Sequence, residues 1–213
     1  SMFMHIPGLK VLAPATPYDA KGGMLSAIED NNPVMFIEQR LLHYQKGIVP
    51  QNYYTIEQGK ARITSEGDQV TLVGISYMQI ECQKAQYYLK ENDISAEVID
   101  PIWLDPIDID TIANSVRKTG KLCIVDNAWL SCGAGSEIIS QVIEKLQNDC
   151  TPQIYRIGFA PVTCPTSPTL EKAFYPNATT IASEVYDFVT GVSNDWIPEE
   201  SKDLAEIEFK GPF

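Results

Sequence analysis

A histidine near the start of the chain is the side chain best suited to moving protons. His5 precedes Pro7, Gly8 and a short apolar segment at residues 9–13. An imidazole titrates near neutral pH, so it can transfer protons or bind a carboxylate. The competing interpretation is an exposed side chain near a frayed terminus. His43 has no evident partner in the sequence and is interpreted as a surface residue.

A second group with potential chemistry is the acidic helix end at residues 27–32. The carboxyl end of a helix exposes carbonyl oxygens that carry partial negative charge. With the carboxylate of Asp30 beside them, these oxygens form a donor set that suits a hard cation. The alternative is a plain helix stop before Pro33.

Two glycines, Gly133 and Gly135, follow a predicted strand and open a predicted helix, an arrangement also found in phosphate-binding turns. The third glycine of a dinucleotide fingerprint is missing, because position 138 is Ile. No acidic residue stands clearly at a strand end about twenty positions later. We therefore interpret this turn as a helix start packed closely against the sheet.

Composition and charge exclude several kinds of partner. The 213 residues carry a net charge of −12, which opposes binding to nucleic acid or to an anionic membrane surface. No apolar stretch is long enough to span a bilayer. The five cysteines are scattered and form no Cys-x-x-Cys pair, which favours free thiols in a reducing compartment over a zinc site.

The first part of the chain reads as strand, helix and strand. An apolar strand at residues 9–13 leads to Thr16 as helix N-cap and Pro17 at the first helical position, and a second strand follows at 34–37. Such a unit normally needs neighbouring strands on both sides. We therefore predict that residues 1–43 are the end of a larger α/β domain, followed by a linker at 44–64 whose last residues form an edge strand.

Strands and helices then alternate through residues 65–190. We expect strands at 70–75, 96–99, 122–125 and 154–157, and helices at 78–90, 109–116, 135–146 and 179–189. This alternation predicts a three-layer α/β/α domain with a mostly parallel sheet. Residues 191–213 read as an acidic tail that docks through apolar side chains, namely Trp196, Ile197, Leu204, Ile207 and Phe209.

An ordered series of motifs runs along the chain: His5-Ile6-Pro7-Gly8-Leu9-Lys10-Val11, Thr16-Pro17-Tyr18-Asp19-Ala20-Lys21-Gly22 and residues 30–34, 36–38, 59–61, 111–112, 115–120, 133–138 and 168–171. This series resembles the beta subunit of thiamine-diphosphate-dependent 2-oxo acid dehydrogenases, the decarboxylating component of pyruvate, branched-chain and acetoin dehydrogenase complexes. The resemblance covers residues 5 to about 190, and the order of the motifs is what makes it specific.

The resemblance implies the fold and several site residues. It implies the end of a pyrimidine-binding domain at 1–43 and a transketolase C-terminal-like domain at 65–190. It places His5 at the active-site channel, against substrate or a lipoyl arm. It also implies a structural monovalent cation, usually potassium, held by Ala27, Asp30 and Asn32.

Two loops depart from the family pattern at the carboxyl ends of predicted strands. Val125-Asp126-Asn127-Ala128-Trp129 stands where the family usually has Val-Glu-Glu-Gly-Trp. Asp100-Pro101-Ile102-Trp103 replaces the usual Asp-Leu-Arg-Thr and lacks its arginine. Because interfaces and sites lie at these strand ends, we expect the partner surface to differ from that of the family.

The sequence thus predicts the C-terminal part of a beta subunit. The complete enzyme would use thiamine diphosphate and magnesium to decarboxylate a 2-oxo acid and would pass the acyl group to a lipoyl acyltransferase core. This chain contains neither the Gly-Asp-Gly motif nor the activating Glu of the cofactor site, so we expect it to be silent alone. The expected partners are an alpha subunit and a second beta subunit, with a homodimer in isolation.

Two other functions stay open at this point. One is a non-catalytic transketolase-C-like assembly module. The other is the C-terminal region of a transketolase or deoxyxylulose-phosphate synthase, in which an arginine after the second strand binds the substrate phosphate; Arg40 lies nearby, although residues 36–38 fit the dehydrogenase pattern better. The expected compartment is the bacterial cytoplasm or the mitochondrial matrix.

Overall fold

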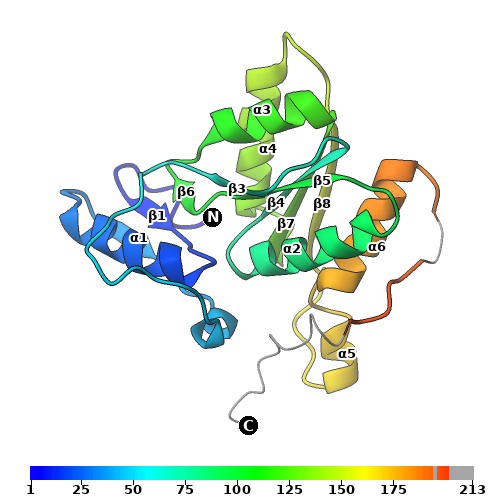
Figure 1. The fold of residues 1–213 in the computed structure, drawn as a ribbon, viewed down its shortest axis with the longest axis horizontal. Helices are drawn as coiled ribbons and strands as arrows, with labels where there is room; N and C mark the ends of the chain where they lie inside the picture. The colour runs from blue at the N-terminus through cyan, green and yellow to red at the C-terminus, as the bar shows by residue number, and fades with distance from the viewer. Residues whose placement is uncertain (194–195, 202–213) are drawn as a thin grey trace.

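The structure is a computed structural model that describes residues 1–193 and 196–201. Two sheets form its framework, one of three strands and one of five (Figure 1). The strands are β1 (Lys10–Leu12), β2 (Val34–Phe36), β3 (Arg62–Ser65), β4 (Val70–Gly74), β5 (Ala96–Asp100), β6 (Trp103–Asp105), β7 (Lys121–Trp129) and β8 (Gln153–Phe159). The helices are α1 (Pro17–Glu29), α2 (Tyr77–Lys90), α3 (Ile109–Thr119), α4 (Ala134–Leu146), α5 (Pro168–Lys172) and α6 (Ala178–Thr190), with a 3-10 turn at Arg40–Tyr44.

The larger sheet has the strand order β3-β5-β4-β7-β8. Strand β4 pairs in parallel with β5 and β7, and β7 pairs in parallel with β8. The edge strand β3 runs antiparallel to β5, so the predicted edge strand is present and the sheet is mixed. Helices α2 and α6 cover one face and α3 and α4 the other, which confirms the predicted three-layer arrangement.

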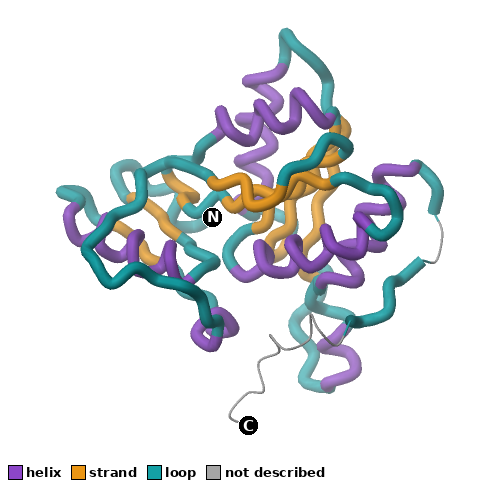
Figure 2. The backbone as a smooth tube through the Cα atoms, viewed as in Figure 1, coloured by secondary structure: helices purple, strands orange, loops and turns teal. Residues whose placement is uncertain are grey.

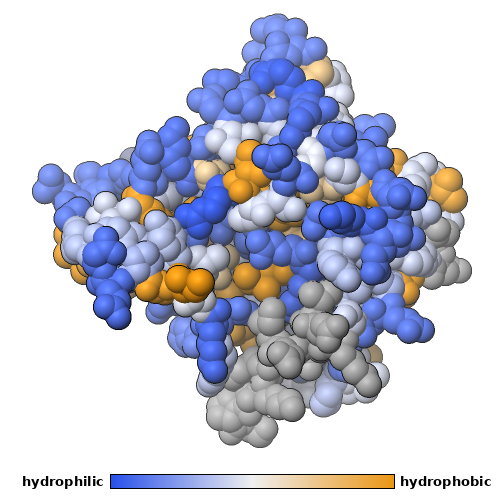
Figure 3. Space-filling view, in the orientation of Figure 1, coloured by the Kyte–Doolittle hydropathy of each residue, from blue (hydrophilic) through white to orange (hydrophobic). Residues whose placement is uncertain are grey.

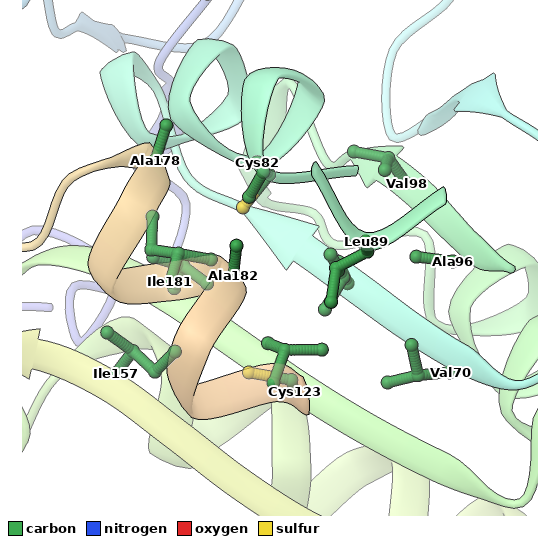
Figure 4. Close-up of a cluster of buried hydrophobic side chains, with 14 of the residues drawn as sticks. Val70, Cys82, Leu89, Ala96, Val98, Cys123, Ile157, Ala178, Ile181 and Ala182 are labelled. Atoms are coloured by element: carbon green, nitrogen blue, oxygen red, sulfur yellow. The ribbon is translucent and has the colours of Figure 1, made fainter. Parts of the chain in front are cut away.

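Apolar side chains fill the layers on both sides of this sheet. Figure 4 shows one layer, in which Leu89 from α2 and Ile181 from α6 meet Val70 and Ile157 from the strands. All four are at most 3% exposed. Burial of such side chains stabilises a fold by roughly 1.5–3 kcal/mol each. The packed layers therefore hold the sheet and its helices together, and the ends of the strands keep their positions with them.

Local capping signals in the sequence correctly locate the helix ends. Thr16 caps α1, and its hydroxyl oxygen accepts a hydrogen bond from the Asp19 amide at 3.1 Å. Asn177 caps α6 in a capping box with Thr180. Gly120 ends α3 in the left-handed conformation with φ of 70°, which glycine adopts without steric cost.

Strand β6 was not predicted from the sequence. Trp103 is fully buried, and the strand pairs antiparallel with β1, next to the parallel pair of β1 with β2 (Figure 2). The two edges of β1 are therefore both occupied, by β2 and by a strand that follows β5 in the chain. The predicted domain boundaries stay a prediction. Strand β6 links the two sheets directly, because it pairs with β1 of the smaller sheet and follows β5 of the larger sheet in the chain.

The predicted tail lies partly outside the described residues, as Leu204, Ile207 and Phe209 do. Within them, Trp196 packs on Tyr186 with ring centroids 5.0 Å apart, whereas Ile197 is 64% exposed.

The space-filling view shows a mostly polar surface on the face seen in Figure 1, with hydrophobic groups gathered between the smaller and the larger part of the molecule (Figure 3).

The segment between the sheets runs across α1 and is held there by specific contacts. The Ser26 hydroxyl donates to the Ile56 carbonyl at 2.8 Å and accepts from the Ile56 amide at 3.0 Å. The rings of Tyr54 and Tyr18 stack with centroids 4.6 Å apart. Gly22 makes this approach possible, because a Cβ atom there would lie 2.7 Å from the Tyr54 ring and 2.8 Å from Ile56.

We therefore predict that Gly22→Ala destabilises the protein by about 1–3 kcal/mol, the usual cost of overpacking a filled contact. The measurement is the free energy of unfolding in denaturant. Alanine in a free helix interior is instead about 1 kcal/mol more favourable than glycine. A gain in stability would therefore contradict the packing of the crossing segment on α1.

Candidate functional site

His5 lies at the rim of a hollow of about 740 Å³ between the first residues of the chain and the larger sheet. Its ring is exposed to solvent. The hollow is also lined by the end of β6, the loop that follows it, and the turn and first helical turns from Cys132 into α4. His5 therefore lies at a site that is lined by residues from both parts of the molecule.

Short turns hold these lining residues in place. The Ile6 amide donates to the Phe3 carbonyl and the Leu9 amide to the Ile6 carbonyl, which coils the chain around His5 before β1 begins. On the opposite side Cys132 has a φ of 56°, uncommon for a residue other than glycine, and leads into Gly133 as the N-cap of α4.

The charged side chains in the lining are acidic. Asp105 and Glu137 both face the hollow, and the lining drawn from the described residues includes no Lys or Arg. Burial raises the pKa of the Asp105 carboxyl above its usual value. Apolar atoms of Met4, Leu104 and Ile107 complete the wall. This lining suits neutral or cationic groups and does not suit the diphosphate of thiamine diphosphate.

The predicted cation ligands do not form an open oxygen site. The Lys10 ammonium is paired with the Asp30 carboxylate at 2.5 Å, and the Gln58 amide donates to the same oxygen at 3.0 Å. The other Asp30 oxygen accepts from the Asn32 amide at 2.8 Å. The hydrogen bonds from Lys10 and then from Asn32 hold the pKa of Asp30 well below its usual range. With Lys10 in place, the carboxylate does not fit a potassium ligand.

Ala27 and Asn32, the other two predicted cation ligands, flank Asp30 in the sequence. Ala27 lies in the last turn of α1, and the Asn32 side chain donates to Asp30 at 3.1 Å.

Across the part of the chain that the structure describes, no three His, Cys, Asp or Glu side chains converge to hold a metal ion. None of the described helices is long and apolar enough to cross a membrane.

The turn at residues 133–135 is explained by packing. A Cβ atom on Gly135 would lie 3.0 Å from the Ile124 side chain of β7, so glycine allows α4 to sit close to the sheet. This agrees with the interpretation of a close-packed helix start.

An ion pair that was not predicted from the sequence joins α1 to the larger sheet. The Arg62 guanidinium donates to both oxygens of Asp19, each at 2.6 Å, and Asp19 is fully buried. The Thr16 hydroxyl also donates to Asp19 at 2.6 Å. In the sequence Asp19 stands out only within the family motif at residues 16–22, and no local pattern connects it with an arginine 43 residues later.

Two family models match the chain in order. The model described as "Transketolase, pyrimidine binding domain" matches residues 1–45, and "Transketolase, C-terminal domain" matches residues 59–181. A solved split-gene transketolase, an inactive beta4 tetramer, is similar with a TM-score of 0.72 at 23% identity, covering 89% of this chain and 60% of that chain. At this identity the likeness shows the fold alone.

Curated relatives are similar over most of this chain. The beta subunit of an acetoin:2,6-dichlorophenolindophenol oxidoreductase from Bacillus subtilis (strain 168) is 42% identical over 182 residues, 85% of this chain and 53% of the relative. The beta subunit of a pyruvate dehydrogenase E1 component from Porphyra purpurea is 37% identical, over 80% of this chain and 52% of the relative. This chain thus spans about half the length of these relatives. With the predicted resemblance confirmed in both parts, the chain belongs to the transketolase C-terminal domain family, preceded by residues of the transketolase pyrimidine-binding domain.

Proposed function

We propose that this chain forms part of the beta subunit of a thiamine-diphosphate-dependent dehydrogenase component that acts on a 2-oxo acid or a related ketone. The observation that carries the proposal is the hollow at His5. It is lined both by residues that match the pyrimidine-binding family and by residues that match the C-terminal family.

The proposed part played by this chain is to build one wall of an active-site channel. Thiamine diphosphate, when bound with magnesium, supplies the nucleophilic carbon that attacks a ketone. Its diphosphate does not fit the acidic lining described above, so we assign cofactor binding to partner chains and expect no turnover from this chain alone. His5 is proposed to hold or move a proton at the channel mouth, where substrate or a lipoyl arm passes.

The proposed partners are an alpha subunit, a second beta subunit and a lipoyl acyltransferase core. Ile143 on α4 is 44% exposed and offers apolar contact for a second copy, and two-fold dimers are the commonest oligomers. The five cysteines are free thiols, which supports a reducing compartment, either the bacterial cytoplasm or the mitochondrial matrix.

A neutral ketone such as acetoin is the second candidate substrate. The negative charges of Asp105 and Glu137 repel a carboxylate, and the described lining provides no Lys or Arg to bind one. The acetoin-oxidising relative from Bacillus subtilis is also the more similar of the two beta subunits compared above. Turnover of acetoin and of 2-oxo acids by the assembled component decides between these substrates.

In the assembled component we predict that His5→Ala lowers turnover by about 10²–10⁴-fold, the usual loss when an acid–base group is removed. His43→Ala is the matched control, because His43 is also exposed and lies in the 3-10 turn, where its ring is 4.0 Å from the Glu38 carboxylate. Steady-state kinetics of both variants is the measurement. Wild-type turnover in His5→Ala would show that His5 is only a surface residue.

For the potassium site we predict no potassium-specific stabilisation, because Lys10 already neutralises Asp30. The measurement compares the melting temperature in potassium chloride with that in choline chloride at equal ionic strength, so that general screening cancels. A higher melting temperature in potassium alone would mean that the cation displaces Lys10, as the family resemblance implies.

A further inference from the structure

Two buried carboxylates lie near one guanidinium where the two sheets meet. Arg62 lies opposite Asp100 in the pairing of β3 with β5, and its guanidinium binds both oxygens of Asp19 on α1. Asp19 and Asp100 are each at most 1% exposed. Of these two carboxylates, Asp19 is the one that binds the guanidinium with both of its oxygens.

Asp100 is the carboxylate left without it. Its Oδ1 atom accepts a hydrogen bond from the Ile102 amide at 3.0 Å. Its Oδ2 atom is buried and has no hydrogen-bond partner among the described residues. A buried ionised carboxylate with one oxygen unpaired is costly, so the carboxyl is more stable when it carries a proton.

Within the described part of the chain, no second cation acts on Asp100. Asp19 faces Asp100 from α1 and Arg62 faces it from β3. The Tyr18 ring lies 5.3 Å from the Arg62 guanidinium carbon and stacks on Tyr54. Burial, together with the charge of Asp19, raises the pKa of Asp100 to about 7, while the hydrogen bond from the Ile102 amide and the charge of Arg62 oppose the rise.

We propose that Asp100 is a proton-operated latch between the two parts of the molecule. While Asp100 is protonated, Arg62 stays on Asp19 and holds α1 against the larger sheet. When Asp100 loses its proton, the new negative charge attracts Arg62, weakens the pair with Asp19 and loosens α1.

The latch acts on the elements that build the hollow. The Ile102 amide bound by Asp100 begins the turn into β6. Strand β6 pairs with β1 and ends at Asp105 in the wall of the hollow. Ionisation of Asp100 therefore changes the support of the wall that faces His5. This inference goes beyond the proposed function and does not depend on any substrate or cofactor.

The direction of the pH dependence follows from the raised pKa. A carboxyl whose pKa is higher in the folded state contributes stability that is present at low pH and is lost as the pH rises through the folded value. For Asp100 the loss occurs between the unfolded value near 4 and about 7. The α1 amides should accordingly be better protected at pH 5.5 than at pH 8.

The test is hydrogen exchange of the α1 amides in the whole chain at pH 5.5 and pH 8, corrected for the intrinsic exchange rate. We expect the protection factors to fall roughly ten- to thirty-fold in the wild type, as linkage predicts for this shift. In Asp100→Asn, which cannot ionise, the fall should disappear. The matched control is Asp110→Asn, which removes an exposed carboxylate paired with Lys145 and should leave the wild-type fall intact.

A direct titration keeps the test decisive if Asp100→Asn does not fold. The side-chain carboxyl carbon of Asp100 in the wild type is followed by NMR from pH 4 to pH 9. We expect its midpoint to coincide with the midpoint for loss of α1 protection. An Asp100 midpoint below pH 5, unchanged α1 protection across the range, or an equal fall in Asp100→Asn would each overturn the latch.

Discussion

The bidentate pair between Asp19 and Arg62 is the contact on which the arrangement of the two sheets depends. Asp19 is fully buried on α1, and Arg62 extends from the edge strand β3 of the larger sheet. The Arg62 side chain is 40% exposed, so the penalty of an unpaired charge falls mainly on the buried Asp19 carboxylate, which loses its counter-charge if Arg62 is removed. The pair therefore holds α1 in one position against the sheet, with the crossing segment packed over it.

The candidate site inherits its geometry from this junction. His5 belongs to the turn that leads into β1, whereas Asp105 ends β6, the strand that follows β5 in the chain, and Gly133 follows β7 of the larger sheet. The hollow exists only while these two parts keep their relative position. Strand β6 and the Asp19–Arg62 pair are two of the connections that maintain it, one through backbone hydrogen bonds and one through charge, and Val11 and Ala13 add apolar contact with the core of the larger sheet. A substitution at the junction is thus expected to alter the geometry of the hollow, although Asp19 and Arg62 do not line it.

Local patterns were enough to predict most helices and strands. Thr16, Gly120 and Asn177 locate helix ends because capping involves atoms only a few residues apart. His5 could be singled out from its type and from the family resemblance, although its role stays a proposal. The close packing of Gly135 also followed from its place between a strand and a helix.

Features that depend on distant residues could not be predicted in this way. Strand β6 has three residues between two prolines, and only its pairing with β1 makes it a strand. Asp19 and Arg62 lie 43 residues apart, and Lys10 reaches Asp30 across 20 residues, so neither pair leaves a periodic signal. The acidic lining likewise brings together Asp105 from the end of β6 and Glu137 from the first turn of α4.

A double-mutant cycle on the junction pair tests this account most directly. Asp19→Asn, Arg62→Met and the double variant are compared with the wild type by their free energies of unfolding in denaturant. If the pair holds the two parts together, the coupling energy should be about 2–3 kcal/mol, in the upper range for contacting residues. A coupling within about 0.5 kcal/mol of zero, the scatter expected for independent sites, would contradict it.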